Sequence, residues 1–129
     1  MKFQPDTLPG VNVVTRHESK RLWVGASAYA HSVLVPWSGA VLPWAPQTFD
    51  ALDAAAFEQI LALRPELVIF GSGQRLRFAA PALMRSLIER RIGVETMDTP
   101  AACRTYNVLV NEGRQVVAAL LLQSAPDGG

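Results

Sequence analysis

The sequence predicts a single α/β domain of three layers, in which a central, mostly parallel mixed sheet is flanked by helices and accompanied by an N-terminal β-hairpin layer. Up to about residue 45, short β-branched runs are separated by Gly, Pro and Ser, a pattern typical of hairpins. From residue 53 onward, segments with helical spacing of apolar residues alternate with short apolar runs. Such alternation places parallel strands in one sheet under helices. We expect the domain to occupy residues 1–123 and residues 124–129 to form a flexible C-terminal tail.

Four short strands are predicted in the N-terminal part. A first hairpin joins residues 11–14 to residues 22–25 across a polar corner, HESKR. A second hairpin joins residues 32–35 to residues 40–42 across a turn that contains Pro and Gly. We expect this layer to pack on whichever face or edge of the central sheet the helices leave open.

The second half of the chain begins with helix signals. Asp53 is placed to cap a helix over residues 54–64, and Pro65 ends that helix. The unbroken apolar run at 67–70 predicts a strand that is buried on both faces. Pro81 lies in the first turn of a second helix, whose buried stripe is expected to consist of Leu83, Met84, Leu87 and Ile88.

A third helix lies between the last two predicted strands. After a short strand at 93–97, Thr99 is expected to be the N-cap and Pro100 the first residue of a helix that ends near residue 111. Gly113 stands where a glycine ends a helix with positive φ. The last strand is expected at 115–122.

Composition excludes several classes of protein. Half of the 129 residues are apolar and only 18% are charged, so the chain is not intrinsically disordered. The balance of 12 basic and 11 acidic residues argues against a nucleic-acid partner, because phosphate contacts need a basic excess. A single cysteine excludes an intramolecular disulfide and a multi-cysteine zinc site. The longest apolar run is too short to span a bilayer, so we expect a soluble, cytoplasmic protein without a membrane span.

A Gly-Ser-Gly turn after the buried strand is the main candidate site, because open parallel sheets bind ligands beyond the carboxyl ends of their strands. The dinucleotide fingerprint is incomplete, since Leu76 stands where its third glycine belongs. Either Gly71 and Gly73 only let the chain leave the strand with positive φ, or the turn lines a pocket for a small anion or a peptide. Nearby guanidinium groups, which suit carboxylate, phosphate and protein contacts, favour the pocket. They belong to Arg75, Arg77, Arg85, Arg90 and Arg91.

Cys103 is the candidate nucleophile if the protein carries out chemistry. It lies in the first turns of the third helix, where the helix dipole lowers a thiol pKa. No histidine stands near it in sequence, and we interpret it as a small buried residue. His17 and His31 have no partners at metal-ligand spacing, so we expect no metal site.

Two further groups of residues each allow two interpretations. Arg104, Asn107 and Asn111 share one helical face, which either faces solvent or lines a groove. The three tryptophans either pack in the core and its corners or form an aromatic interaction surface; they are Trp23, Trp37 and Trp44.

Four motifs follow one another along the chain. They are a G-[ST]-G turn after an apolar strand, then G-[IV]-E-x-M-x-T, then A-x-x-T-[YF]-N-x-L, and finally E-x-R-x-V-x-A-A-L. The matching residues are Gly71, Ser72 and Gly73; Gly93, Val94, Glu95, Met97 and Thr99; Ala102, Thr105, Tyr106, Asn107 and Leu109; and Glu112, Arg114, Val116, Ala118, Ala119 and Leu120. From about residue 10 onward, the chain therefore resembles the small α/β domain family of unassigned function that includes a mitochondrial respiratory complex I (NADH dehydrogenase) assembly factor of the Mth type.

The resemblance implies a three-layer α/β fold with a central sheet of mixed direction. It implies no settled catalytic residue and no cofactor, and for the eukaryotic member it implies a role in assembling a respiratory complex.

Our leading hypothesis is a non-enzymatic binding or assembly module that acts in the assembly of a protein complex such as a respiratory complex. Its expected partner is another protein, with a small anion as a second candidate ligand. Its binding surface is expected where the 71–78 loop, the end of the 93–97 strand and the start of the third helix meet. The candidate residues are Gly71, Ser72, Gly73, Arg75, Arg77, Met97, Asp98, Thr99, Arg104 and Tyr106. The alternative is a small-molecule enzyme that uses the same cleft, with Cys103, Asp98 or Tyr106 in a chemical role.

Overall fold

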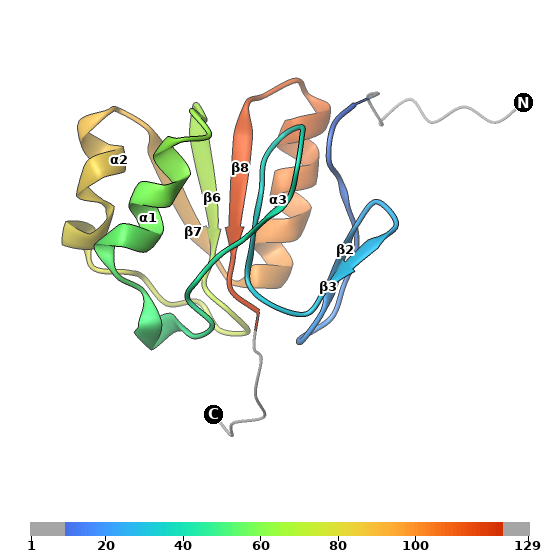
Figure 1. Cartoon of the computed structure of the whole chain (residues 1–129), viewed down its shortest axis with the longest axis horizontal. Coiled ribbons are helices and arrows are strands. Elements are labelled where there is room, and N and C mark those ends of the chain that lie inside the picture. The colour runs from blue at the N-terminus through green and yellow to red at the C-terminus, as the bar shows by residue number, and fades with distance from the viewer. Residues whose placement is uncertain (1–9, 123–129) are drawn as a thin grey trace, which may run out of the picture.

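The computed structural model describes residues 10–122, and Figure 1 shows their arrangement. The expected tail at 124–129 lies outside these residues. The N-terminal strands are β1 (Val14–His17), β2 (Leu22–Val24), β3 (Ser27–Tyr29), β4 (Val33–Val35) and β5 (Leu42–Pro43). The helical segments are η1 (Phe49–Ala51), α1 (Ala54–Leu61), η2 (Pro81–Met84), α2 (Arg85–Glu89) and α3 (Thr99–Asn111), where η denotes a 3-10 turn. The remaining strands are β6 (Leu67–Gly71), β7 (Gly93–Met97) and β8 (Val116–Leu120).

A five-stranded mixed sheet of order β5-β4-β8-β6-β7 forms the centre of the domain. β6 runs parallel to both of its neighbours, whereas β4 is antiparallel to β8 and to β5. In β6, Val68, Ile69 and Phe70 are fully buried, as their unbroken apolar run predicted. The predicted α/β fold around a mostly parallel mixed sheet is therefore confirmed.

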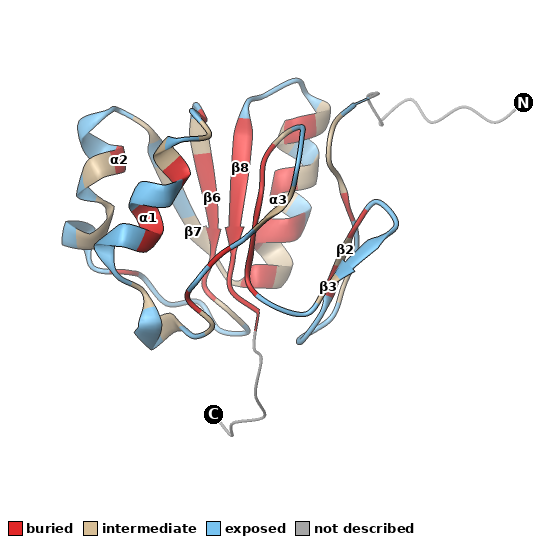
Figure 2. Cartoon of the chain, viewed as in Figure 1, coloured by how far each residue is buried: buried red, intermediate tan, exposed pale blue. Residues whose placement is uncertain are grey.

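One apolar cluster lies on each face of this sheet and packs the sheet against the layer that covers that face. On one face, Phe57 of α1 and Leu87 of α2 belong to the same cluster as Phe70 of β6. On the other face, α3 packs against β6 and β8 and also against β1, which is part of a separate antiparallel sheet of order β1-β2-β3. Figure 2 shows the buried residues concentrated in β6, β8 and the side of α3.

The N-terminal hairpin layer is confirmed for the first hairpin, which gains a third strand, β3. The second hairpin, β4–β5, instead joins the central sheet. Val33, Leu34 and Val35 of β4 are all fully buried and pair with residues 118–120 of β8. A strand covered on both faces needs no alternation of apolar and polar residues, which explains the continuous apolar run of β4.

The first helix begins as predicted but ends at Leu61, before the predicted end at residue 64. The Asp53 carboxylate accepts the Ala56 N–H at 2.9 Å and so caps α1, as predicted. The second helix is wrong in form, because its first four residues make the 3-10 turn η2. Because a 3-10 turn has fewer residues per turn than an α-helix, the residues after it face other directions than an unbroken α-helix would give them. Ile88 is therefore 54% exposed instead of buried.

The N-cap of the third helix lies one residue earlier than predicted. Asp98, and not Thr99, is the N-cap of α3, since its carboxylate accepts the Ala101 N–H at 2.9 Å. Pro100 consequently occupies the second helical position, and Gly113 follows the helix with φ of +86° as predicted.

Candidate functional site

The carboxyl ends of β6, β7 and β8 lie at one edge of the central sheet because these strands are parallel, and this is the lower edge in Figure 1. Gly71 at the end of β6 is in register with Met97 of β7 and Leu120 of β8. The loop after β6 and the start of α3 therefore meet here, as the sequence predicted for the candidate surface.

Ser72 holds the loop after β6 in a compact turn. Ser72 is 2% exposed, and its N–H donates to the Met97 carbonyl at 2.8 Å. Its hydroxyl donates to the Arg75 carbonyl at 2.7 Å and accepts the Arg77 N–H at 3.0 Å. A single buried side chain thus determines the path of the main chain over residues 72–77.

Thr99 joins the start of α3 to this turn. Its hydroxyl accepts the Gly73 N–H at 2.9 Å and donates to the Leu121 carbonyl at 2.8 Å, while its own N–H donates to the Gly73 carbonyl at 2.8 Å. A Cβ atom at Gly71 would lie 2.9 Å from the Thr99 hydroxyl oxygen, so this close approach requires glycine. Gly73 has φ of +107°, as the turn interpretation predicts, whereas Gly71 does not adopt a positive φ.

Several main-chain donors of this edge are occupied within the protein. The N–H groups of Ser72 and Gly73 are paired as described, Ala101 donates to the Asp98 side chain, and Ala102 donates to the Asp98 carbonyl. Pro100 has no N–H. The amides of Ser72, Gly73, Ala101 and Ala102 are therefore not free to bind an anion. A small-anion site here stays a prediction that rests on arginine side chains.

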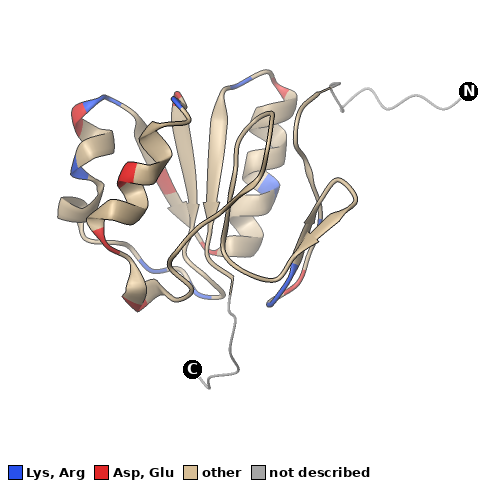
Figure 3. Cartoon of the chain, viewed as in Figure 1, with Lys and Arg blue, Asp and Glu red and all other residues tan. Residues whose placement is uncertain are grey.

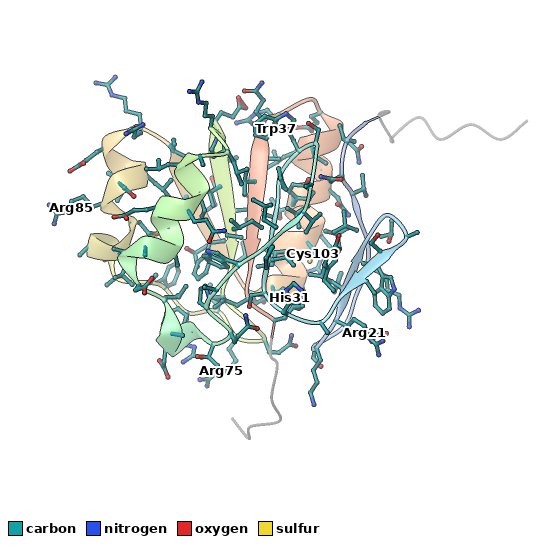
Figure 4. All side chains as sticks on the ribbon, viewed as in Figure 1. Arg21, His31, Trp37, Arg75, Arg85 and Cys103 are labelled. Atoms are coloured by element: carbon teal, nitrogen blue, oxygen red, sulfur yellow. The ribbon has the colours of Figure 1, made fainter. Side chains whose placement is uncertain are left out.

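Three candidate arginines, Arg75, Arg77 and Arg104, are exposed. Among residues 10–122 the ion pairs join Arg16 to Glu18 and Arg114 to Glu66, so these three have no carboxylate partner there. Figure 3 shows basic positions along the loop between β6 and η2, and Figure 4 shows Arg75 at the lower edge of the molecule. The Arg77 guanidinium lies over the Phe49 ring, 4.6 Å from its centroid, in a cation–π contact.

Cys103 and Tyr106 point into the core instead of toward this surface. Burial raises the pKa of Cys103 to about 12, so the thiol stays protonated at neutral pH, although the nearby Arg104 charge acts in the opposite direction. Tyr106 is fully buried, and its hydroxyl lies 2.9 Å from the carbonyl oxygens of Asn12 and Pro36. Burial also raises the pKa of Tyr106. Both residues therefore have packing roles.

The histidines and tryptophans are divided among different parts of the structure. His31 is exposed, and residues 10–122 contain no group of three His, Cys, Asp or Glu side chains placed to hold a metal ion. Trp44 is fully buried and donates its ring N–H to the Ala56 carbonyl at 2.9 Å, as core packing predicts. Trp23 is half-buried, with the guanidinium groups of Arg16 and Arg21 at 4.8 and 5.4 Å from its ring centroid.

A depression beside the candidate edge was not expected from the sequence. It has a volume of about 230 Å³ and is open to solvent. Its lining residues are Phe49, Asp50, Leu52, Ala79, Ala80 and Leu83. The sequence feature that could have indicated this depression is the run RLRFAA, in which two large apolar residues alternate with arginines outside any strand.

Comparisons with known proteins place the chain in a family. Residues 14–121 match the family described as "Protein of unknown function (DUF498/DUF598)". The chain is 35% identical over 107 residues to a Bos taurus protein named NADH dehydrogenase (ubiquinone) 1 alpha subcomplex assembly factor 3, a match that covers 81% of this chain and 55% of that protein. The chain thus spans about half the length of the curated relatives it matches.

Solved structures agree with this match. A crystal structure of a Bordetella parapertussis protein superposes with a TM-score of 0.83 at 35% identity and covers 90% of this chain and 99% of that one. A solution structure of a Bordetella pertussis Mth938-like domain superposes with a TM-score of 0.82 at 30% identity, covering 95% of this chain and 93% of that one.

The helices of the described part of the chain all lack the length and hydropathy needed to span a bilayer. The family resemblance predicted from the four sequence motifs is confirmed. The chain belongs to the DUF498/DUF598 family of proteins of unknown function.

Proposed function

We propose that this domain is a non-enzymatic protein-binding module that acts in the assembly of a respiratory complex, and that it binds its partner at the carboxyl edge of β6 and β7. The observation that carries the proposal is the 35% identity over 107 residues to a protein named as an NADH dehydrogenase assembly factor. Such a role requires a protein-binding surface and no reaction at the surface.

The features of the carboxyl edge are consistent with binding. Gly71, Ser72 and Thr99 form a buried, hydrogen-bonded frame that keeps the loop after β6 in one conformation. On this frame Arg75 and Arg77 are exposed, and arginine is among the residues most often important in protein interfaces. A preformed loop loses little conformational entropy when a partner binds, which favours affinity.

The three residues that the enzyme alternative would use are each engaged in other contacts. The Cys103 thiol is buried, the Tyr106 hydroxyl contacts two main-chain carbonyls, and the Asp98 carboxylate caps α3. These contacts favour the binding module over the enzyme.

A genetic complementation experiment tests the proposal. The gene for this chain is deleted in the organism that carries it, and assembled NADH dehydrogenase is measured by native gel electrophoresis with in-gel NADH oxidation. We expect the assembled complex to decrease, the wild-type gene to restore it, and the double variant Arg75→Glu/Arg77→Glu to fail to do so.

The matched control is Arg64→Glu/Arg90→Glu, which makes the same charge change at exposed positions before β6 and β7, at the opposite edge of these strands. This control should restore assembly. An unchanged level of assembled complex in the deletion strain would refute the assembly role, and full rescue by Arg75→Glu/Arg77→Glu would refute the proposed surface.

A further inference from the structure

Exposed apolar side chains gather on the loop between β6 and η2. Among residues 10–122, four large apolar side chains are more than half exposed, and two of them are Leu76 at 52% and Phe78 at 72%. They stand two residues apart, and Phe78 directly precedes Ala79, which lines the depression of about 230 Å³. Two large apolar side chains exposed on one short loop beside a depression favour an interaction site, whereas isolated exposed apolar residues are common on protein surfaces.

This apolar surface is held in place from both sides. The Ser72 hydroxyl bonds to the Arg75 carbonyl and the Arg77 N–H, so the loop just before and within the apolar pair is anchored to the core. The Arg77 guanidinium lies over Phe49, which itself lines the depression. Leu76 and Phe78 are therefore presented on a supported loop beside an open depression.

The charges near the depression differ in sign from one side to the other. Arg75 and Arg77 lie on the loop that leads to the lining residues Ala79 and Ala80, and neither arginine has a carboxylate partner among residues 10–122. Asp50 lies on the opposite wall, which η1 forms. An acidic ligand is thus attracted to Arg75 and Arg77 and repelled by Asp50.

We infer that the loop at 74–80 and the depression lined by Phe49, Leu52 and Leu83 bind a segment of a partner protein that presents a large apolar side chain next to acidic side chains. The apolar side chain enters the depression and packs against Phe78, and the acidic groups contact Arg75 and Arg77. This inference rests on the proposed role as a protein-binding module and gives the chemistry of the segment that is bound.

Peptide selection on the purified full chain tests the inference. Random peptides are displayed and selected for binding, and the enriched sequences are synthesised and titrated by fluorescence anisotropy. We expect the enriched peptides to combine Leu, Ile or Phe with Asp or Glu. Phe78→Ser, and separately Arg75→Glu/Arg77→Glu, should weaken their binding about tenfold or more, the loss typical of interface hot spots.

Ile88→Ser and Arg64→Glu/Arg90→Glu are the matched controls. Ile88 is 54% exposed and lies on α2, outside the depression lining, so its replacement removes a similar apolar side chain from another surface. Thermal melting verifies that every variant is folded. The controls should bind the peptides as the wild type does.

Three outcomes would overturn the inference. One is enrichment of basic peptides or of no common composition, and another is peptide binding that Phe78→Ser leaves unchanged. The third is self-association of the wild type in sedimentation that Phe78→Ser abolishes, which would make a second copy of the chain the occupant. Normal NADH dehydrogenase assembly in the deletion strain, together with specific peptide binding, would refute the proposed role and leave this site standing.

Discussion

The side-chain amide of Asn107 forms two hydrogen bonds to the main chain of Val14. Its Oδ1 accepts the Val14 N–H at 2.9 Å, and its Nδ2 donates to the Val14 carbonyl at 2.8 Å. α3 thereby satisfies main-chain groups of β1 much as a neighbouring strand would. The adjacent Tyr106 hydroxyl contacts the Asn12 carbonyl just before β1. Two consecutive residues of one helix therefore attach the N-terminal sheet to the domain.

Replacement of Asn107 by Ala should destabilise the domain by about 1–3 kcal/mol, because both Val14 groups lose their partner in a part-buried position. Urea unfolding measures the change. Amide hydrogen exchange should accelerate in β1 and β2 more than in β6.

Asn111→Ala is the control, since Asn111 lies one turn further along α3 and its Oδ1 has no hydrogen-bond partner among residues 10–122. An equal loss of stability in the two variants would contradict the specific role of Asn107.

The central fold could be predicted because its signals are local. Three examples are the apolar run of β6, the helical spacing in α1 and the Asp53 cap, and each of these signals is contained in a few neighbouring residues. β3 gives no such signal, since Ser27 and Ala28 are exposed and the strand is defined by its ladder with β2. The place of β4 is likewise decided by pairing with β8, more than eighty residues away. Non-local pairing of this kind has no signature in a single sequence.

The candidate site could be predicted only in part, for the same reason. Strand order brings the Gly-Ser-Gly turn to the start of α3, and this follows from parallel topology. The contact between Arg77 and Phe49 joins the loop before η2 to η1, and neither of these 3-10 turns was predicted. The face of Asn107 was open to two interpretations, solvent or groove, and the structure shows instead that it packs against β1.

The residues that follow α2 and α3 allow the cost of a left-handed backbone conformation to be tested by opposite substitutions. Both end in the same pattern. The N–H of the residue after the cap donates to the carbonyl three residues earlier, and the N–H of the next residue donates to the carbonyl five residues earlier. Gly113 occupies the left-handed position after α3 with φ of +86°, and Arg91 occupies it after α2 with φ of +61°. A non-glycine residue in this conformation costs about 1–2 kcal/mol.

We therefore expect Arg91→Gly to stabilise the domain and Gly113→Arg to destabilise it. The magnitudes should be about 1 kcal/mol each, since glycine also gains entropy in the unfolded chain. Chemical denaturation of the two variants measures both changes. A loss of stability in Arg91→Gly would show that the Arg91 side chain contributes more than the backbone strain costs.

The buried thiol of Cys103 predicts a loss of stability at alkaline pH. Burial raises its pKa from 9.0 to about 12, so the unfolded chain releases this proton at a lower pH than the folded chain does. The stabilisation is complete below about pH 9 and is lost as pH rises toward 12, with a slope of up to about 1.4 kcal/mol per pH unit. Tyr106, whose pKa is also raised by burial, adds to the loss at the upper end.

Urea unfolding at several pH values between neutral and strongly alkaline measures this slope. Cys103→Ala removes the titrating group and should give a shallower decrease from about pH 9 upward. The same variant should complement the gene deletion as well as the wild type does, because the thiol packs in the core. A folded Cys103→Ala protein without function would instead support a chemical role for the thiol.

Inorganic phosphate provides the last test of the carboxyl edge. Because the amides of Gly73 and Ala101 already donate to Thr99 and Asp98, an anion cannot use them without breaking those hydrogen bonds. Exposed guanidinium groups alone bind phosphate weakly, and salt screens the interaction. We expect phosphate to perturb the Arg75 and Arg104 side-chain resonances at low ionic strength and to leave the Gly73 and Ala101 amides unshifted.

Amide and guanidinium chemical-shift titrations measure these effects, with chloride at matched ionic strength as the reference. Arg75→Gln/Arg104→Gln should remove the phosphate-specific shifts while the spectrum otherwise stays that of the folded domain. Saturating shifts at Gly73 and Ala101 at millimolar phosphate, corresponding to about −4 kcal/mol of binding free energy, would show that the turn opens to accept an anion. The buried frame around Ser72 and Thr99 would then be a ligand site and not a fixed support.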